Sequence, residues 1–274
     1  MKELAVLYSG GTDSTCAVAL MTPDFDRVHL LTYSRFGVFF ADHAGVNVQK
    51  LKDKFGEGKF IHRVMNIDKL FKAVSYSRYI PALAAHGLFL LTTCGLCKLA
   101  MHIRTLVYCL DNNIGYVCDG ANNNMDYASD QIREFIGELK ALYRRFGVEY
   151  NSPVYEFAHP DDSGWFDKMG MGSLTGAGEE KKDSVVTTGE ELFRMGIFPK
   201  KNMKGTAQDR RMQARCFQLV LANIFANWVY IPRYGLEKYK KGCVDLYKEK
   251  IGYFSGLIEE YSRKNKKSML YKLI

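Results

Sequence analysis

The apolar positions of the first 150 residues fall into two alternating patterns. Short continuous apolar runs, the length of buried β-strands, occupy residues 4–8, 28–33, 60–64 and 114–118. Between and after them, apolar residues recur every three or four positions and predict helices within residues 15–21, 47–55, 99–110 and 132–146. Such alternation predicts an α/β fold, a parallel sheet flanked by helices, which binds ligands beyond the carboxyl ends of its strands.

The alternating pattern stops after residue 158, so we expect three parts. Residues 1–158 predict one α/β domain. Residues 159–189 are rich in glycine, with few β-branched residues, and predict a long loop or lid. Residues 190–274 predict a helical C-terminal region, whose strongest helices span 207–229 and 236–263.

The composition is that of a globular protein outside the membrane. Hydrophobic residues make up 47% of the 274 and charged residues 25%. The most apolar stretch, residues 219–232, is interrupted by Asn223, Asn227 and Pro232, so we expect no membrane span. The chain starts on a predicted strand without a signal-peptide pattern, and we expect it in the cytoplasm. The net charge of +8 suits RNA, although an ordinary basic surface explains it equally.

The turn between the first predicted strand and helix carries phosphate-binding chemistry. Its sequence is Ser9-Gly10-Gly11-Thr12-Asp13-Ser14. Its glycines allow a ligand to approach the backbone, and the following helix start offers amides and a positive dipole end to an anion. Its hydroxyls can donate to phosphate oxygens, and Asp13 indicates Mg²⁺ because bare phosphate would repel it. The alternative is a simple helix-capping turn. The Walker ending Gly-Lys-Ser/Thr is missing.

The six-residue string resembles the SGGxDS signature of the PP-loop ATP pyrophosphatase superfamily. Members of that family cleave ATP between its α and β phosphates, pass AMP to a substrate oxygen, and let a nucleophile displace it. The resemblance implies that Ser9, Gly11, Asp13 and Ser14, with Gly10 and Thr12 beside them, hold the pyrophosphate side of ATP. It also implies that adenine lies near the end of the second strand, at Tyr33 and Ser34.

A second stretch resembles 7-cyano-7-deazaguanine synthase over roughly residues 1–150. It comprises Asp119-Gly120-Ala121-Asn122, then Asp126-Tyr127 and Arg133-Glu134-Phe135-Ile136. The resemblance implies that Gly120 contacts the nucleotide and that Asp119, Asn122 and Asp126 form a second wall of the site. The alternative for each of the three polar residues is an ordinary polar loop with an aspartate cap.

Seven cysteines, an odd number, argue against a disulfide framework. Cys94 and Cys97 have C-x-x-C spacing, which lets both sulfurs reach one metal, one cluster or each other. We expect a helix to begin near Lys98. The dipole of that helix and the charge of Lys98 both favour thiolates just before it. The alternative is a pair of small buried core residues. We prefer that alternative for three other cysteines, Cys16, Cys109 and Cys118.

The C-x-x-C followed by a late cysteine resembles the iron–sulfur-dependent tRNA thiolation enzymes of the PP-loop superfamily. There, three cysteines hold a 4Fe–4S cluster with one iron open for sulfur. The four-cysteine zinc pattern of the synthase is missing. The third ligand would be Cys216 or Cys243; we prefer Cys216, because residues 187–197 resemble the synthase segment that precedes its first zinc cysteine and residues 210–215 are basic. A core thiol on an amphipathic helix is the alternative for Cys216.

Together these features predict an ATP-dependent adenylating enzyme that activates a substrate carbonyl, on tRNA or a small molecule, for sulfur insertion. Asp13, Cys94, Cys97 and Cys216 are its candidate catalytic residues. Its expected cofactors are ATP, Mg²⁺ and a 4Fe–4S cluster, with zinc as the alternative, and a sulfur donor is an expected partner. The alternatives are an amide- or nitrile-forming ligase and a nucleotide-binding module without catalysis.

Overall fold

A computed structural model describes most of the chain. The described residues are 1–77, 79–91, 93–123, 128–158, 186–203, 206–212, 214–265 and 267–274. Most of the expected glycine-rich loop, residues 159–185, therefore lies outside them, as do Asp126 and Tyr127 of the second stretch.

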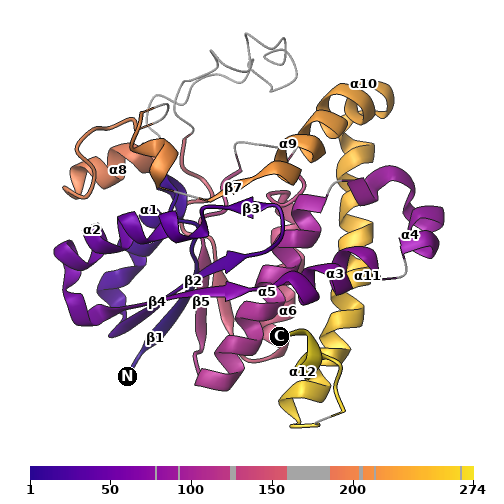
Figure 1. Cartoon of the computed structure of the whole chain (residues 1–274), viewed down its shortest axis with the longest axis horizontal. Coiled ribbons are helices and arrows are strands. Elements are labelled where there is room, and N and C mark those ends of the chain that lie inside the picture. The colour runs from indigo at the N-terminus through magenta and orange to yellow at the C-terminus, as the bar shows by residue number, and fades with distance from the viewer. Residues whose placement is uncertain are drawn as a thin grey trace.

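The centre of the molecule is a five-stranded parallel sheet in the order β4-β2-β1-β5-β6 (Figure 1). Its strands are β1 (Glu3–Leu7), β2 (Arg27–Ser34), β4 (Phe60–Asn66), β5 (Tyr116–Asp119) and β6 (Glu149–Asn151). The expected parallel sheet flanked by helices, with a helical C-terminal part, is confirmed. The chain enters at the central strand β1, winds outward to β4 and then returns to β5 on the other side of β1. Ligands of such sheets bind where the winding reverses, at the carboxyl ends of β1 and β5.

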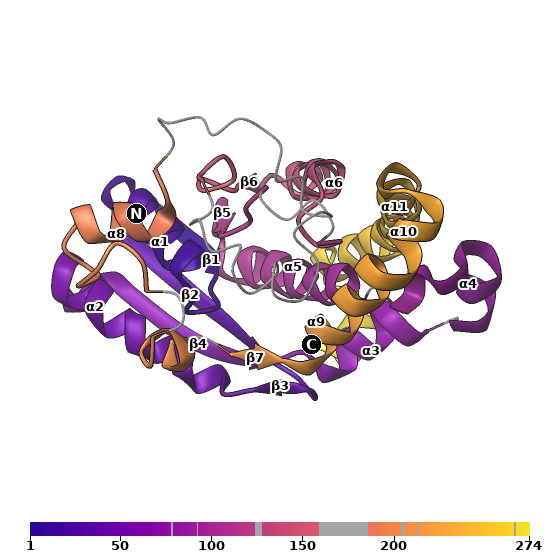
Figure 2. The ribbon, with the colours of Figure 1, turned by 90° about the horizontal axis from the view of Figure 1, so that it is seen from above.

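Helices cover both faces of the sheet (Figure 2). One face carries α1 (Thr12–Met21), α2 (Gly45–Phe55) and α8 (Thr188–Arg194), and the other carries α3 (Asp68–Tyr76), α5 (Thr93–Asn112) and α6 (Arg133–Arg145). Strand alternation explains this: Leu4 and Val6 of β1 pack into the first core, whereas Ala5 and Leu7 pack into the second. Continuous apolar strands are therefore buried on both sides, as parallel sheets require.

The C-terminal helices extend the second core. They are α9 (Phe217–Ile224), a π-helical turn η7 (Phe225–Tyr230), α10 (Ile231–Tyr234), α11 (Leu236–Ser262) and α12 (Leu270–Leu273). Helix α11 packs on α5 and α6 through Tyr239, Leu246 and Tyr247, which belong to the same core as the sheet. None of the helices in the described ranges has both the length and the apolar character that crossing a membrane requires.

Several short elements complete the described chain. A two-stranded antiparallel sheet joins β3 (Val38–Phe39) to β7 (Arg215–Cys216). Helix α4 (Tyr79–His86) lies between α3 and α5. The short 3-10 helices are η1 (Thr22–Asp24), η2 (Ala41–Ala44), η3 (Glu57–Lys59), η4 (Gly87–Leu91) and η6 (Asp209–Arg211).

Three expected boundaries are wrong. The helix expected at residues 207–229 begins only at Phe217, because Cys216 pairs with Val38 as a strand instead. The helix expected near Lys98 begins at Thr93. The expected loop 159–189 ends earlier, because Thr187 accepts from the Glu190 amide and starts α8 with a capping box.

Candidate functional site

The loops that follow β1 and β5 meet at the carboxyl edge of the sheet. Leu7 and Asp119, the last residues of these adjacent strands, are in register. The next residue after β5, Gly120, lies so close to α1 that a Cβ there would come 2.5 Å from the Ser14 nitrogen. Only glycine fits this contact, so Gly120 joins the candidate phosphate loop to the candidate second wall.

The loop from Ser9 to Ser14 has the features that an anion needs. Gly11 is the N-cap of α1, and it has no side chain that could cap the amides of the first turn. The hydroxyls of Ser9 and Ser14 lie 3.0 Å apart, and Ser9 Oγ also accepts from the Gly11 amide at 3.2 Å. A helix start with uncapped amides and adjacent hydroxyls is complementary to phosphate oxygens. The six residues therefore lie together at the switch point of the sheet, where a phosphate group would bind.

Asp13 and Gly10 are fixed by segments from elsewhere in the chain. The Thr188 hydroxyl of α8 donates to Asp13 Oδ1 at 2.6 Å, so the carboxylate is held at the first turn of α1. Gly10 has a positive φ of 80°, and a Cβ there would lie 2.3 Å from the carbonyl oxygen of Met212. The segment that ends in β7 is thus packed directly over the phosphate loop.

The expected adenine region lies at the end of β2, beside the loop. Tyr33 is buried, and its hydroxyl hydrogen-bonds to that of Thr105 on α5 at 2.6 Å. The tyrosine ring therefore belongs to the core between sheet and helix. Ser34 is half-buried at the last position of the strand. A role for both in binding adenine stays a prediction.

The second wall centres on a buried ion pair. Asp119 Oδ2 lies 3.0 Å from Lys98 Nζ, and its Oδ1 accepts from Ser152 Oγ and from the Ala121 amide. Burial opposes ionisation of Asp119, but Lys98 and then His102 outweigh it and lower its pKa to about 2. Lys98 therefore pairs with Asp119, and its charge does not serve to stabilise thiolates at the C-x-x-C. The backbone amide of Asn122 donates to Gln131 Oε1 at 3.2 Å.

His102 lies buried next to this ion pair, and its burial predicts that the fold is sensitive to acid. Burial lowers its pKa from 6.5 to about 3, against the opposing charge of Asp119. As the pH falls below 6.5, the unfolded chain binds a proton here that the folded chain does not. Unfolding free energy should then drop by about 1.4 kcal/mol per pH unit from this residue. Asp119 adds a separate loss only below pH 3.8, its unfolded value.

Urea unfolding at pH 7 and pH 5 checks this prediction. His102→Asn keeps a hydrogen-bonding side chain near the Tyr143 hydroxyl, which lies 3.1 Å from His102 Nδ1, but cannot titrate. Between pH 7 and pH 5, the free energy of unfolding of the wild type should fall by about 2 kcal/mol more than that of the variant. Equal losses in both proteins would show that His102 is not the group responsible.

The C-x-x-C lies within the first turn of α5, at the same edge of the sheet. Cys97 is buried and Cys94 half-buried. Burial is the main cause that raises the pKa of both thiols, to about 11 for Cys97, while Arg35 opposes it. Gly95 between them is required by packing, because a Cβ there would lie 2.0 Å from the Tyr247 hydroxyl oxygen of α11.

Gly95→Ala should therefore destabilise the protein by about 2–4 kcal/mol, because the buried Tyr247 must shift to make room. Gly137 of α6 is the matched control, since a Cβ there meets open space. Gly137→Ala should raise stability by about 0.5–1 kcal/mol through helix propensity alone. Thermal and urea unfolding of both variants measure the contrast, and an unchanged Gly95→Ala midpoint would contradict it.

Arg35 contacts both the C-x-x-C and the third candidate cysteine, Cys216. This arginine follows β2 directly and is only 5% exposed. Its Nε donates to Cys97 Sγ at 2.9 Å and its Nη2 to Cys216 Sγ at 3.4 Å. Cys94 interacts electrostatically with both other thiols. Cys243, the alternative third ligand, instead lies on α11 in the core. The buried alternative holds for the remaining three, Cys16, Cys109 and Cys118.

The three converging thiols match a metal or cluster in chemistry but not in arrangement. Thiolate sulfur is the ligand that zinc and iron–sulfur clusters use. Across the described residues, no group of three or more His, Cys, Asp and Glu side chains is placed to hold a metal ion. The Arg35 guanidinium instead occupies the place beside two of the sulfurs. In this arrangement the thiols gather around a cation, the Arg35 guanidinium, and do not surround a metal or cluster.

Two residues of this site are missed by the sequence patterns, Arg35 and Thr188. Arg35 could have been noticed as a charged residue directly after a buried strand, at the ligand-binding edge. Thr188 has no local signal, since its partner Asp13 is 175 positions away.

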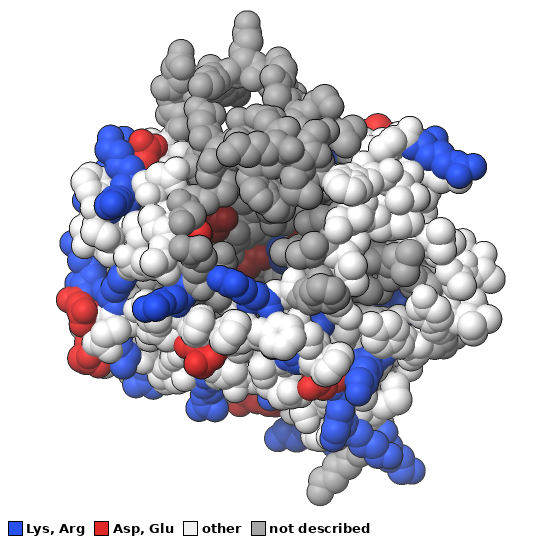
Figure 3. Space-filling model, turned by 45° about the horizontal axis from the view of Figure 1, so that its top comes forward, with Lys and Arg blue, Asp and Glu red and all other residues white. Residues whose placement is uncertain are grey.

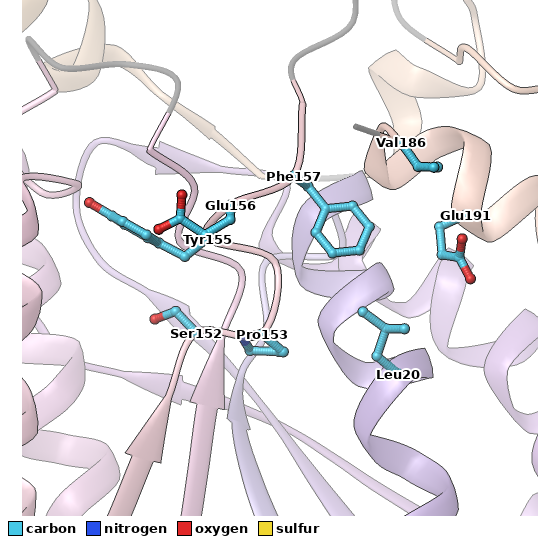
Figure 4. A pocket seen from close by; sticks show the side chains of 8 residues that line it. All are labelled: Leu20, Ser152, Pro153, Tyr155, Glu156, Phe157, Val186 and Glu191. Carbon is cyan, nitrogen blue, oxygen red and sulfur yellow. The ribbon is translucent and has the colours of Figure 1, made fainter. Parts of the chain in front are cut away.

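The carboxyl edge is recessed (Figure 3): acidic side chains show inside the hollow, and Lys and Arg side chains lie along part of its rim. A separate pocket of about 480 Å³ opens beside β6, between the loop 152–157 and helices α1 and α8 (Figure 4). It is lined by Leu20, Ser152, Pro153, Tyr155, Glu156, Phe157, Val186 and Glu191. None of these belongs to the phosphate loop or to the thiols, so the pocket neighbours the site. Ser152 connects the two through its bond to Asp119, and Tyr155 connects them through its bond to the Gln131 carbonyl.

Comparison with known proteins adds little to this geometry. No family model matches the chain, and no curated protein matches it. A solved structure that resembles it is a predicted subunit of tRNA methyltransferase from Methanocaldococcus jannaschii. That chain is 18% identical, with a TM-score of 0.36, over 57% of this chain and 71% of the other. A likeness of this extent leaves the site itself as the basis for a functional proposal.

Proposed function

We propose that the protein is an ATP-dependent adenylating enzyme that activates a substrate carbonyl for sulfur insertion. The observation that carries the proposal is the placement of three thiols and a phosphate loop at one edge of the sheet. The loop opens at the switch point between β1 and β5. Cys97 and Cys216 meet at the end of β2, the neighbouring strand. The resemblance of the loop to the PP-loop signature supports ATP, with Mg²⁺ at Asp13, as the ligand.

The reaction has two stages. The substrate carbonyl oxygen attacks the α-phosphorus of ATP, and the bond to the β-phosphate breaks to release pyrophosphate. Before this, one cysteine thiolate attacks the outer sulfur of a persulfide donor, and the donor leaves as a thiolate, so the cysteine now carries the persulfide. The terminal persulfide sulfur attacks the activated carbon, and AMP leaves with the original oxygen. A second cysteine then attacks the sulfur that remains on the first, which frees the thiolated substrate and leaves a disulfide for an external thiol to reduce.

The backbone amides at the start of α1 and the hydroxyls of the loop act on the phosphates of ATP in this scheme. The uncapped first turn of α1 and the hydroxyls of Ser9 and Ser14 stabilise the charge that develops on pyrophosphate. Gly120 keeps the second wall close to that turn. The basic surface, with a net charge of +8, supports tRNA as the substrate, and a small molecule is the second candidate.

Product analysis tests the proposal. Purified protein, Mg²⁺ and α-labelled ATP are incubated with bulk tRNA, a persulfide sulfur donor and a thiol reductant, and AMP, pyrophosphate and thiolated nucleosides are measured. AMP with stoichiometric sulfur in the RNA supports the proposal. AMP with ammonia but not with the persulfide donor favours the ligase. Iron in anaerobically purified protein would assign the sulfur carrier to the 4Fe–4S cluster, and zinc without iron again favours the ligase.

A further inference from the structure

The unusual feature of the thiol site is a buried guanidinium whose partners are sulfurs. Within the described parts of the chain, the hydrogen-bond acceptors of Arg35 are Cys97 Sγ, Cys216 Sγ and the carbonyl of Phe36 at 2.8 Å. Its guanidinium also lies over the Phe71 ring, 4.2 Å from the centroid. A buried cation is unfavourable unless it is bound, so its position needs an explanation.

The geometry of the donors supplies that explanation. Nε and Nη2 belong to one edge of the planar guanidinium, whose parallel N–H groups hold the two oxygens of one carboxylate in ordinary ion pairs. Here the two places are taken by sulfurs from distant segments, α5 and β7. Nη1, at the other end of the group, donates to the Phe36 carbonyl and fixes the orientation. The two sulfurs therefore lie side by side on one edge.

We infer that Arg35 is a positioning residue that selects Cys97 and Cys216, and not the C-x-x-C pair, as the thiols that exchange with each other. The role of that exchange in sulfur transfer rests on the proposed function. The pairing of Cys97 with Cys216 does not rest on the proposed function, because it follows from the two donors on one edge of the Arg35 guanidinium. Both cysteines are free thiols in the structure, so a disulfide between them is the oxidised form of this site.

Mild oxidation of the whole protein tests the pairing without ATP or substrate. One thiol adds to the N=N bond of diamide, the second thiol displaces the adduct, and the products are a disulfide and the hydrazine. Metal-free reduced protein receives one equivalent of diamide, remaining thiols are alkylated, and linked peptides are identified and timed by mass spectrometry. Wild type should give mainly the Cys97–Cys216 link, and Cys94→Ser should give the same link at the same rate.

Arg35 variants test its role. Arg35→Gln should slow the Cys97–Cys216 link by about tenfold or more and shift the product towards Cys94–Cys97, because proximity is lost. Arg35→Lys keeps the charge but not the two parallel donors, so it should recover only part of the rate. The matched control is Arg63→Gln on β4, whose guanidinium lies over the Tyr108 ring, 5.6 Å from its centroid; this variant should oxidise like wild type. Circular dichroism and melting temperature accompany each variant, and Arg35→Lys decides if Arg35→Gln does not fold.

The inference is overturned if wild type links mainly Cys94 to Cys97, or if both Arg35 variants form the Cys97–Cys216 link at the wild-type rate. Failure of the proposed function looks different. In that case no AMP forms with any nucleophile, whereas the arginine-dependent link still appears. Conversely, AMP and thiolated product without this link would remove only the inference.

Discussion

Asp13→Ala is expected to lower AMP formation by at least about a hundredfold, equivalent to about 3 kcal/mol of transition-state stabilisation. Asp13 lies in the first turn of α1, where the phosphates of ATP would meet the helix start. A carboxylate there repels phosphate unless a divalent cation lies between them, so its contribution depends on Mg²⁺. The variant should therefore also need more Mg²⁺ for its residual activity. Pyrophosphate release at a series of Mg²⁺ concentrations measures both effects.

Thr188→Val provides the control for Asp13. It removes the hydroxyl that donates to Asp13 Oδ1 at 2.6 Å but leaves the carboxylate in place. If the carboxylate binds Mg²⁺, this variant should lose only about threefold to tenfold, the equivalent of one hydrogen bond. Undiminished turnover in Asp13→Ala would refute a role for Asp13. Equal losses in the two variants would mean that the bond to α8 matters, and the cation does not.

One short segment of the chain connects the phosphate loop with the thiols. The carbonyl of Met212 covers Gly10 of the phosphate loop, and four residues later Cys216 reaches Arg35. Arg35 in turn follows β2, the strand that pairs with β1. A nucleotide at the loop and a sulfur carrier at the thiols would therefore contact the two ends of the same short connection. If the proposed function holds, such an arrangement brings the activated carbonyl and the sulfur nucleophile to one edge of one sheet.

The sheet could be predicted from the sequence because its signals are local. The four predicted strands and the helices that follow them are present as β1, β2, β4 and β5 with α1, α2, α5 and α6. Strand β6 escaped prediction because it spans only Glu149–Asn151 and buries one side chain, Tyr150. Helix α3 was not predicted either, although its apolar residues Leu70, Phe71 and Val74 have helical spacing.

The site was harder to predict because its contacts are not local. The strand β7 forms only because Cys216 pairs with Val38, and nothing within residues 207–216 indicates that pairing. Lys98 is near the C-x-x-C in sequence, yet the side chain pairs with Asp119 of β5. Arg35, which contacts two of the three candidate thiols, lies 62 positions from Cys97 and 181 from Cys216. Tertiary pairing decides such contacts, and local propensity does not register them.

Gly10→Ala is expected to abolish ATP binding and to destabilise the protein by several kcal/mol. Two effects add at this position. The φ of 80° disfavours any residue with a Cβ by about 1–2 kcal/mol. The new Cβ would also lie 2.3 Å from the Met212 carbonyl oxygen and 2.5 Å from the Ala44 Cα, both backbone atoms that cannot move alone. The segment over the loop must then be displaced, which also disturbs the approach of Cys216 to Arg35.

Gly196 separates the two effects. Its φ is 73°, yet a Cβ there meets nothing within 4 Å, so Gly196→Ala carries the backbone strain without the collision. It should lose about 1–2 kcal/mol of stability and keep full ATP affinity. Isothermal titration with ATP and urea unfolding of both variants give the comparison. If Gly10→Ala loses no more stability than Gly196→Ala and still binds ATP, then the segment around Met212 does not close over the phosphate loop, and the proposed connection between loop and thiols fails with it.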